Sequence, residues 1–186
     1  MRIIVIAALA AALASAAQAE TPASAPAAAA KPPSNLIEAL QAAGLDPRTK
    51  VEGASVQVMQ GQRAIFHLDA AGKPVMNGVD AGRIGLATAD GKGETYKGPG
   101  AGKLAFALDS SPEKRQSIMK VWNGLARPVA YEIEITAVRQ GKLMKRLATI
   151  CTVPAGGATH EAWPDPIVSV TLSKFAETPA DKFTCQ

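Results

Sequence analysis

The sequence predicts an all-β fold, a single β-sandwich preceded by a short N-terminal helix, over residues 35–186. Three observations predict this class. Apolar and polar side chains alternate along several short segments, as they do in half-buried strands. Turn-forming residues interrupt these segments about every ten residues, which is the spacing of a sandwich. Only one segment, near the N-terminus, has helical spacing of its apolar residues.

The N-terminus has the layout of a secretory signal peptide, residues 1–19. A basic Arg2 precedes the apolar run Ile3–Ala14, and Ala17–Ala19 form a small-x-small cleavage motif. We expect cleavage after Ala19. The apolar run is shorter than the about 20 residues that cross a bilayer, so no membrane span is expected. The next residue is Glu20 rather than the cysteine of a lipoprotein, so no lipid anchor is expected either. These features predict a periplasmic protein.

An Ala/Pro-rich linker and a short helix are expected next. Residues 20–34 carry no large apolar side chain that could anchor them to a core, which is typical of an extended linker. Asn35 and Glu38 have the spacing of a helix capping box. Gly44 stands where a C-terminal glycine ends a helix. The pattern predicts a helix over residues 36–43 that needs a surface to pack on.

The remaining sequence predicts strands and two long loops. One segment is ambiguous: Pro112 could begin a helix, but the alternation of Ile118, Lys120 and Trp122 with apolar neighbours favours a strand. The glycine-rich residues 90–103 and the proline-containing residues 154–166 are expected to be irregular. Strands are expected near residues 51–59, 64–68, 74–76, 83–89, 103–108, 116–122, 129–138, 143–153 and 167–175.

The segment Val121–Tyr131 reads Val-Trp-Asn-Gly-Leu-Ala-Arg-Pro-Val-Ala-Tyr. It resembles a segment of immunoglobulin-like exported bacterial β-sandwich domains, which run strand, Asn, short loop, Pro, strand. The resemblance implies an immunoglobulin-like fold and no particular activity. The Cys…Trp…Cys spacing of true immunoglobulin domains is absent, because Trp163 lies between the two cysteines in a proline-rich segment.

The two cysteines, Cys151 and Cys185, are expected to form one disulfide, because an even number of cysteines in an exported chain is most simply paired. Cys185 is the penultimate residue, so the bond would hold a C-terminal tail that would otherwise fray. The two residues lack the Cys-x-x-Cys spacing of a redox pair.

No catalytic, metal or cofactor motif is found. The glycine-rich segment before Lys103 lacks the hydroxyl residue that follows the lysine of a phosphate loop, because Leu104 stands there. The histidines His67 and His160 belong to no hydrolase or zinc motif. A formal net charge of +4 is too small to predict a nucleic-acid partner. We therefore expect a protein that is not an enzyme and binds no metal or cofactor.

Positive charge gathers around a predicted hairpin turn at Gln140. Eight basic and three acidic residues lie between Glu113 and Arg146. Such a hairpin could touch an anionic polymer, headgroup or envelope protein. It could equally be a strand edge on which basic residues prevent aggregation. Four basic residues flank the turn: Arg139, Lys142, Lys145 and Arg146.

The leading hypothesis is therefore a non-catalytic periplasmic interaction or structural module that uses the basic hairpin or a sheet edge. The alternative is a small-ligand or glycan-binding domain that uses Trp163 and residues 154–166, with Trp163 stacked on a sugar ring, although the sequence favours Trp163 as a cap on the sandwich. Glu161 and Asp165 in the same segment are candidate paired carboxylates of a glycosidase. The third hypothesis is a hydrolase with an unrecognised site. A binding domain predicts that Trp163 is exposed in a concave site, whereas an interaction module predicts a continuous basic or apolar surface.

Overall fold

A computed structural model describes residues 36–42, 44–85, 94–111, 113–140, 142–179 and 185. The signal-peptide and linker predictions, and the predicted strand residues 86–89, lie outside these ranges. All the described residues belong to one compact unit, Pro33–Gln186.

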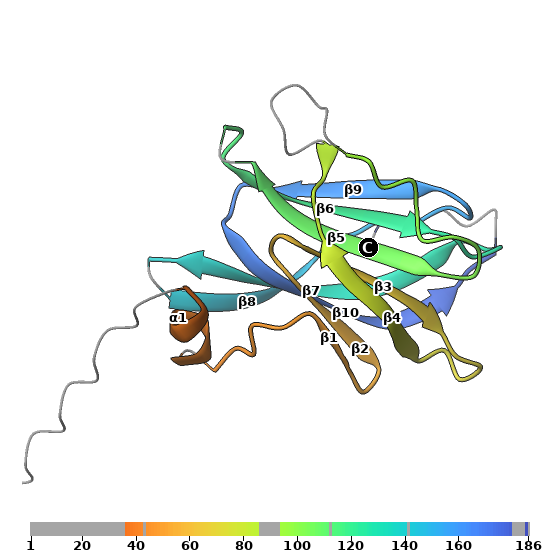
Figure 1. Cartoon of the computed structure of the whole chain (residues 1–186), viewed down its shortest axis with the longest axis horizontal. Coiled ribbons are helices and arrows are strands. Elements are labelled where there is room, and N and C mark those ends of the chain that lie inside the picture. The colour runs from red at the N-terminus through yellow and green to blue at the C-terminus, as the bar shows by residue number, and fades with distance from the viewer. Residues whose placement is uncertain are drawn as a thin grey trace, which may run out of the picture. The chain divides into compact units, whose positions relative to one another are not determined.

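The described residues form ten strands in two antiparallel five-stranded sheets, with one short helix (Figure 1). The first sheet, sheet A, has the order β1-β2-β10-β7-β8, and the second, sheet B, has the order β4-β3-β5-β6-β9. The strands of sheet A are β1 (Lys50–Glu52), β2 (Ser55–Met59), β10 (Ile167–Glu177), β7 (Val129–Arg139) and β8 (Lys142–Ala148). The strands of sheet B are β4 (Pro74–Ala81), β3 (Gln62–Leu68), β5 (Leu104–Ser111), β6 (Gln116–Asn123) and β9 (Ala158–Trp163).

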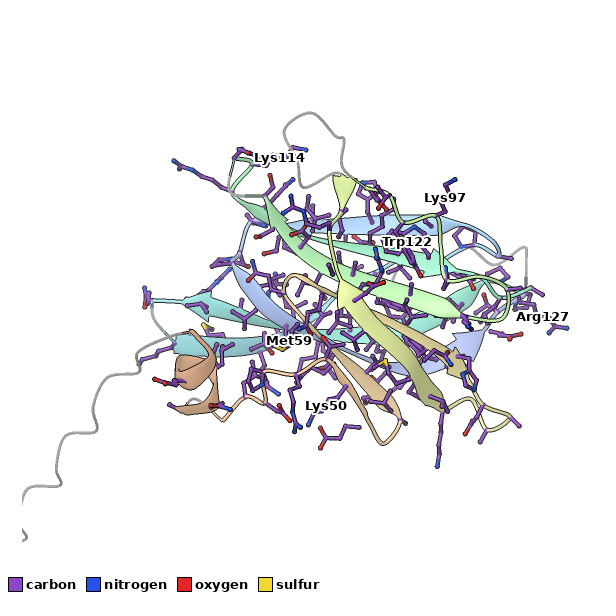
Figure 2. All side chains as sticks on the ribbon, in the orientation of Figure 1. Lys50, Met59, Lys97, Lys114, Trp122 and Arg127 are labelled. Atoms are coloured by element: carbon purple, nitrogen blue, oxygen red, sulfur yellow. A yellow bond between two sulfur atoms is a disulfide. The ribbon has the colours of Figure 1, made fainter. Side chains whose placement is uncertain are left out.

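One hydrophobic core joins the inner faces of the two sheets, and side chains fill the space between them (Figure 2). Its centre is aromatic. The ring of Phe106 on β5 lies 5.1 Å from that of Tyr131 on β7 and 5.6 Å from that of Phe66 on β3, measured between centroids. Phe175 on β10 contacts the same three rings. Burial of these large rings, and their edge-to-face packing, stabilise the contact between the sheets.

The outer face of sheet A is partly covered by α1 (Leu36–Ala42). Buried Leu40 and Leu45 pack there with Met59 of β2 and Val168 of β10. Gly44 ends the helix as predicted: its φ is 78°, and its N–H donates to the carbonyl of Gln41 at 2.9 Å. The predicted helix is thus confirmed, and the sheet supplies the packing surface that so short a helix needs.

The outer face of sheet B is covered by the segment 94–100. The Arg63 guanidinium lies 3.5 Å from the centroid of the Tyr96 ring, and that ring packs edge-on against Trp122 at 5.0 Å. Beside them the Lys120 ammonium contacts both carboxylate oxygens of Glu94 at 2.9 Å. Residues 94–103 contain no strand, as predicted, but this loop packs tightly on the sheet through an aromatic side chain and an ion pair.

Asn123 organises the connection between β6 and β7. Its side-chain amide donates to the carbonyls of Arg127 at 2.9 Å and Val153 at 3.1 Å, and its carbonyl accepts the N–H of Leu125 at 2.9 Å. The residue is 2% exposed. The asparagine that carries the resemblance noted above therefore has a structural role here: it satisfies buried backbone groups of two connections at once.

Three strand predictions were wrong, while the ambiguous segment is β6, a strand as favoured. Residues 83–85 form no strand. The predicted strand 143–153 ends at Ala148. The predicted irregular segment 154–166 contains β9, which pairs with β6 from Ser117↔Trp163 to Trp122↔Ala158. The alternation of β9 is Thr159, Glu161 and Trp163, so a charged residue occupies a core-facing position and hides the apolar pattern.

Candidate interaction site on the β7–β8 hairpin

The predicted basic hairpin is formed by β7 and β8. The two strands pair from Arg139↔Lys142 next to the turn to Ile133↔Ala148. Gln140 has a φ of 51°, as the first position of a type I′ turn requires. No described residue pairs with the other side of β8, which is the edge of sheet A.

Two of the four basic residues that sequence reasoning singled out hold an acidic residue of the chain. The Arg139 guanidinium lies 2.9 Å from one carboxylate oxygen of Asp165, and that of Arg146 lies 3.3 Å from the other. The Asp165 side chain is only 12% exposed. The hydrogen bonds from Arg139, more than those from Arg146, hold the pKa of this carboxyl below its usual range. These two arginines thus fasten the hairpin to the connection between β9 and β10.

The two lysines are freer. Lys145 lies 3.1 Å from Glu134 of β7, with its side chain 60% exposed, and such an exposed pair contributes little to stability. Lys142 is exposed and makes no ion pair with any described residue. The four basic residues of the hairpin therefore face two acidic partners, and an excess of positive charge remains at its surface.

Large apolar side chains are also exposed on β8. Met144 is 51% exposed and Leu147 is 71% exposed. Within the described ranges, the other two large exposed apolar side chains are Val75 and Val79 of β4, which is the edge of sheet B. The exposed apolar surface of this domain therefore lies on two sheet edges, and exposed apolar groups on an edge favour contact with another chain.

A hollow adjoins Leu147 at the end of β8. It has a volume of about 410 Å³ and lies between the end of β8 and β10. It is lined by Tyr131, Glu132, Ile133, Leu147, Ala148, Thr149, Ile150 and Lys174. Since β7 is the strand between β8 and β10, the hollow lies on the β7 side of β8 and not at the free edge of the sheet.

Trp163, the candidate stacking residue, lies in the core instead. It is 9% exposed and belongs to the cluster between the sheets. The requirement of the glycan-binding hypothesis, an exposed Trp163 in a concave site, is therefore not met. Its burial follows from its register, because Trp163 pairs with buried Ser117 at the end of β9.

The two carboxylates beside Trp163 have separate structural environments. Asp165 is held by the two arginines, whereas burial raises the pKa of Glu161, partly offset by a hydrogen bond from the Cys151 backbone and by the nearby His160. The other histidine, His67, has its ring nitrogen 3.1 Å from the side-chain oxygen of Asn77. The described residues include no group of three or more His, Cys, Asp or Glu side chains that could hold a metal ion.

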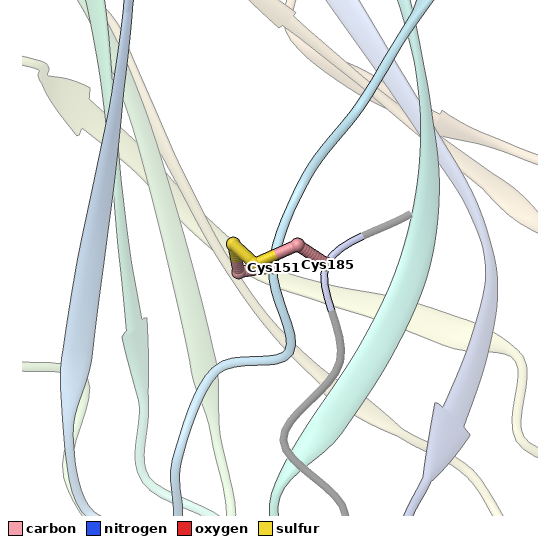
Figure 3. The surroundings of a disulfide bond; sticks show 2 residues. All are labelled: Cys151 and Cys185. Carbon is pink, nitrogen blue, oxygen red and sulfur yellow. A yellow bond between two sulfur atoms is a disulfide. The ribbon is translucent and has the colours of Figure 1, made fainter.

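The predicted disulfide between Cys151 and Cys185 is confirmed (Figure 3). The two residues form an isolated antiparallel bridge, with their Cα atoms 3.8 Å apart. Cys151 also lies next to Ile150, which belongs to the core cluster. The bond therefore holds the C-terminal end of the chain against the segment that connects β8 to β9.

Sequence reasoning missed Asp165 as the partner of the hairpin, and it missed the exposed Met144 and Leu147. Asp165 is 26 residues from Arg139 in sequence, and no local pattern reveals such a contact. The run from Leu143 to Leu147 did carry a signal, because its apolar residues do not alternate as those of a half-buried strand do.

No protein-family model, curated protein or solved structure matches this chain. Within the described ranges, no helix is both long and apolar enough to span a membrane.

Proposed function

We propose that this chain is a non-catalytic interaction module of the bacterial periplasm, with an immunoglobulin-like sandwich fold, that contacts an anionic partner or surface through the β7–β8 hairpin. The observation that carries the proposal is the edge strand β8, on which exposed basic and exposed apolar side chains occur together. A metal site has no comparable support among the described residues.

The signal-peptide layout of residues 1–19 supports the proposed periplasmic location. The paired cysteines agree with an oxidising compartment. Support for the sandwich comes from the shared core of the two sheets and from the Asn123 connection. The immunoglobulin-like identity rests on the resemblance of residues 121–131.

The test is envelope association of a variant that removes only the freer charges, Lys142→Gln with Lys145→Gln. Arg139 and Arg146 stay in place, because their loss would also release the poorly exposed Asp165. The matched control is Lys73→Gln with Lys97→Gln, two exposed lysines that have no ion pair with a described residue and lie outside the hairpin. Circular dichroism checks that all variants are folded.

We expect the hairpin variant to lose co-sedimentation with envelope fractions while the control sediments like the wild type. Raising the salt should weaken wild-type sedimentation, because the Debye length falls from about 10 Å at 0.1 M to about 3 Å at 1 M. Salt-insensitive sedimentation that both variants retain would contradict the proposed contact. If only the hairpin variant scatters light as an aggregate and its sedimentation is unchanged, the lysines act as aggregation gatekeepers.

A further inference from the structure

We propose that β8 binds an extended, acidic segment of another protein, which adds to sheet A as a further strand. This inference rests on the proposed function and specifies its partner. It differs from a contact with a polymer or a lipid surface, because the backbone of β8 itself takes part.

The register of the hairpin indicates which backbone groups are available. Arg139 and Lys142 flank a two-residue connection, so they form a hydrogen-bonded pair. From there along an antiparallel ladder, hydrogen-bonded pairs alternate with non-hydrogen-bonded pairs. Ala137↔Met144 and Ile135↔Arg146 are then also hydrogen-bonded pairs.

The three residues of β8 between and beyond these belong to non-hydrogen-bonded pairs, so their N–H and C=O groups point away from β7 toward the free edge. They are Leu143, Lys145 and Leu147. Alternate backbone groups of an edge strand are what an added strand uses, and main-chain hydrogen bonds then supply affinity.

Side chains on β8 indicate the chemistry of the added strand. Lys142 and Lys145 favour acidic residues opposite them, since opposite charges directly across a sheet are stabilising. Met144 and Leu147 offer apolar contacts on the two faces of the strand. The segment that fits this edge therefore does not alternate strictly: it carries acidic residues opposite Lys142 and Lys145 and apolar residues opposite Met144 and Leu147.

A second copy of the chain fits the edge poorly. In an antiparallel pairing of two β8 strands that is centred on Lys145, the two copies of that lysine lie directly opposite each other. A shift of the register toward the turn sets Lys142 opposite Arg146, and a shift the other way sets two copies of Arg146 opposite each other. Every extensive antiparallel self-pairing register therefore opposes like charges, which is destabilising, so charge complementarity favours an acidic partner.

The test uses the full mature protein and a synthetic probe, a capped nine-residue peptide that contains the run Val-Val-Glu-Glu-Val-Val-Glu, which in an antiparallel pairing faces Ala148 to Lys142 of β8. Lys145→Pro is compared with Lys145→Gln: both remove the charge, and only proline removes the N–H that points to the free edge. A second peptide carries N-methyl groups on two adjacent central residues, so it loses a donor whichever of its edges faces β8. A polyglutamate peptide and phosphatidylglycerol vesicles are the comparison ligands.

We expect this peptide to bind the wild type, and N-methylation or Lys145→Pro to weaken binding about tenfold relative to its matched control, as the loss of one or two backbone hydrogen bonds implies. In the wild type, amide hydrogen exchange should slow on binding at Leu143, Lys145 and Leu147. This measurement does not depend on whether the proline variant folds.

Strand addition would be overturned if the N-methylated peptide or polyglutamate bound as tightly as the unmodified peptide and binding gave these three amides no added protection from exchange. That result would be compatible with a purely electrostatic contact. The envelope assay with the lysine variants tests such a contact independently of strand addition. Absence of peptide binding, or binding to the vesicles alone, would also overturn the inference.

Discussion

Removal of the disulfide should lower stability by an amount that can be worked from the loop it closes. Cys151 and Cys185 are 34 residues apart in sequence. In the chain-entropy model, a cross-link over a loop of this length stabilises the folded state by about 3.8 kcal/mol. We expect a decrease of about 2–4 kcal/mol in the free energy of unfolding.

The assay is urea unfolding of the oxidised wild type and of the variant Cys151→Ser with Cys185→Ser, which leaves no free thiol. The wild type reduced with a thiol reagent is the matched control, since it loses the bond and keeps both sulfur atoms. The two should unfold alike, and thiol labelling of the denatured, oxidised wild type should find no free cysteine. A double variant within about 0.5 kcal/mol of the oxidised wild type would refute the reasoning, because the loop-closure effect is several times larger.

The remaining predictions concern single side chains near β9. Trp163→Ala should cost about 3–5 kcal/mol in urea unfolding, as for a core aromatic, whereas an exposed stacking residue would cost well under 1 kcal/mol. Glu161→Gln should stabilise the protein at pH 7, and its advantage should shrink as the pH falls toward 4, because the raised pKa of Glu161 means that its ionised form opposes folding. Asp165→Asn should have the opposite profile: a folded-state pKa below the unfolded value contributes stability that is present at neutral pH and lost in acid. Unfolding curves between pH 3 and pH 7 measure both, and profiles of the same sign would contradict these environments.

The fold class could be predicted from the strands that lie inside both sheets. In β7 the apolar residues Tyr131, Ile133 and Ile135 alternate with Glu132 and Glu134, and the structure buries the first set in the core. Such alternation arises because one face of an antiparallel strand meets the core and the other meets water. The disulfide could be predicted as well, because only two cysteines are present.

The edge strands could not be predicted in the same way. Among the described strands, β8 pairs only with β7, and most of its side chains are exposed. Apolar and polar residues therefore need not alternate along its sequence. In β9, the edge strand of sheet B, Glu161 occupies an inner-face position. Its partly buried carboxylate accepts a hydrogen bond from the Cys151 backbone, which offsets part of the cost of burial. The contact of Asp165 with Arg139 depends on how two sheets meet, which no local pattern encodes.

The gatekeeping interpretation of the hairpin and the choice of an acidic partner over a second copy rest on one physical effect, like-charge repulsion across β8. If this repulsion is what keeps two copies apart, reversing it on one partner should bring them together. Lys145→Glu places a glutamate opposite Lys145 of a wild-type copy in the register centred on that residue, and it leaves the like charges of the other two registers in place. We therefore expect the wild type and this variant each to be monomeric, and their mixture to contain a heterodimer at low salt.

Light scattering coupled to size-exclusion chromatography measures the oligomeric state. In 1 M salt the heterodimer should dissociate, because salt screens the attraction between exposed charges. The Lys145→Glu substitution also sets a second carboxylate beside Glu134 within one chain, so the variant's own fold must be checked by circular dichroism. A mixture that stays monomeric at low salt, with both proteins folded, would mean that like-charge repulsion is not what prevents two β8 strands from pairing. The choice of an acidic partner over a second copy would then lose its physical basis, since the same repulsion supports both conclusions.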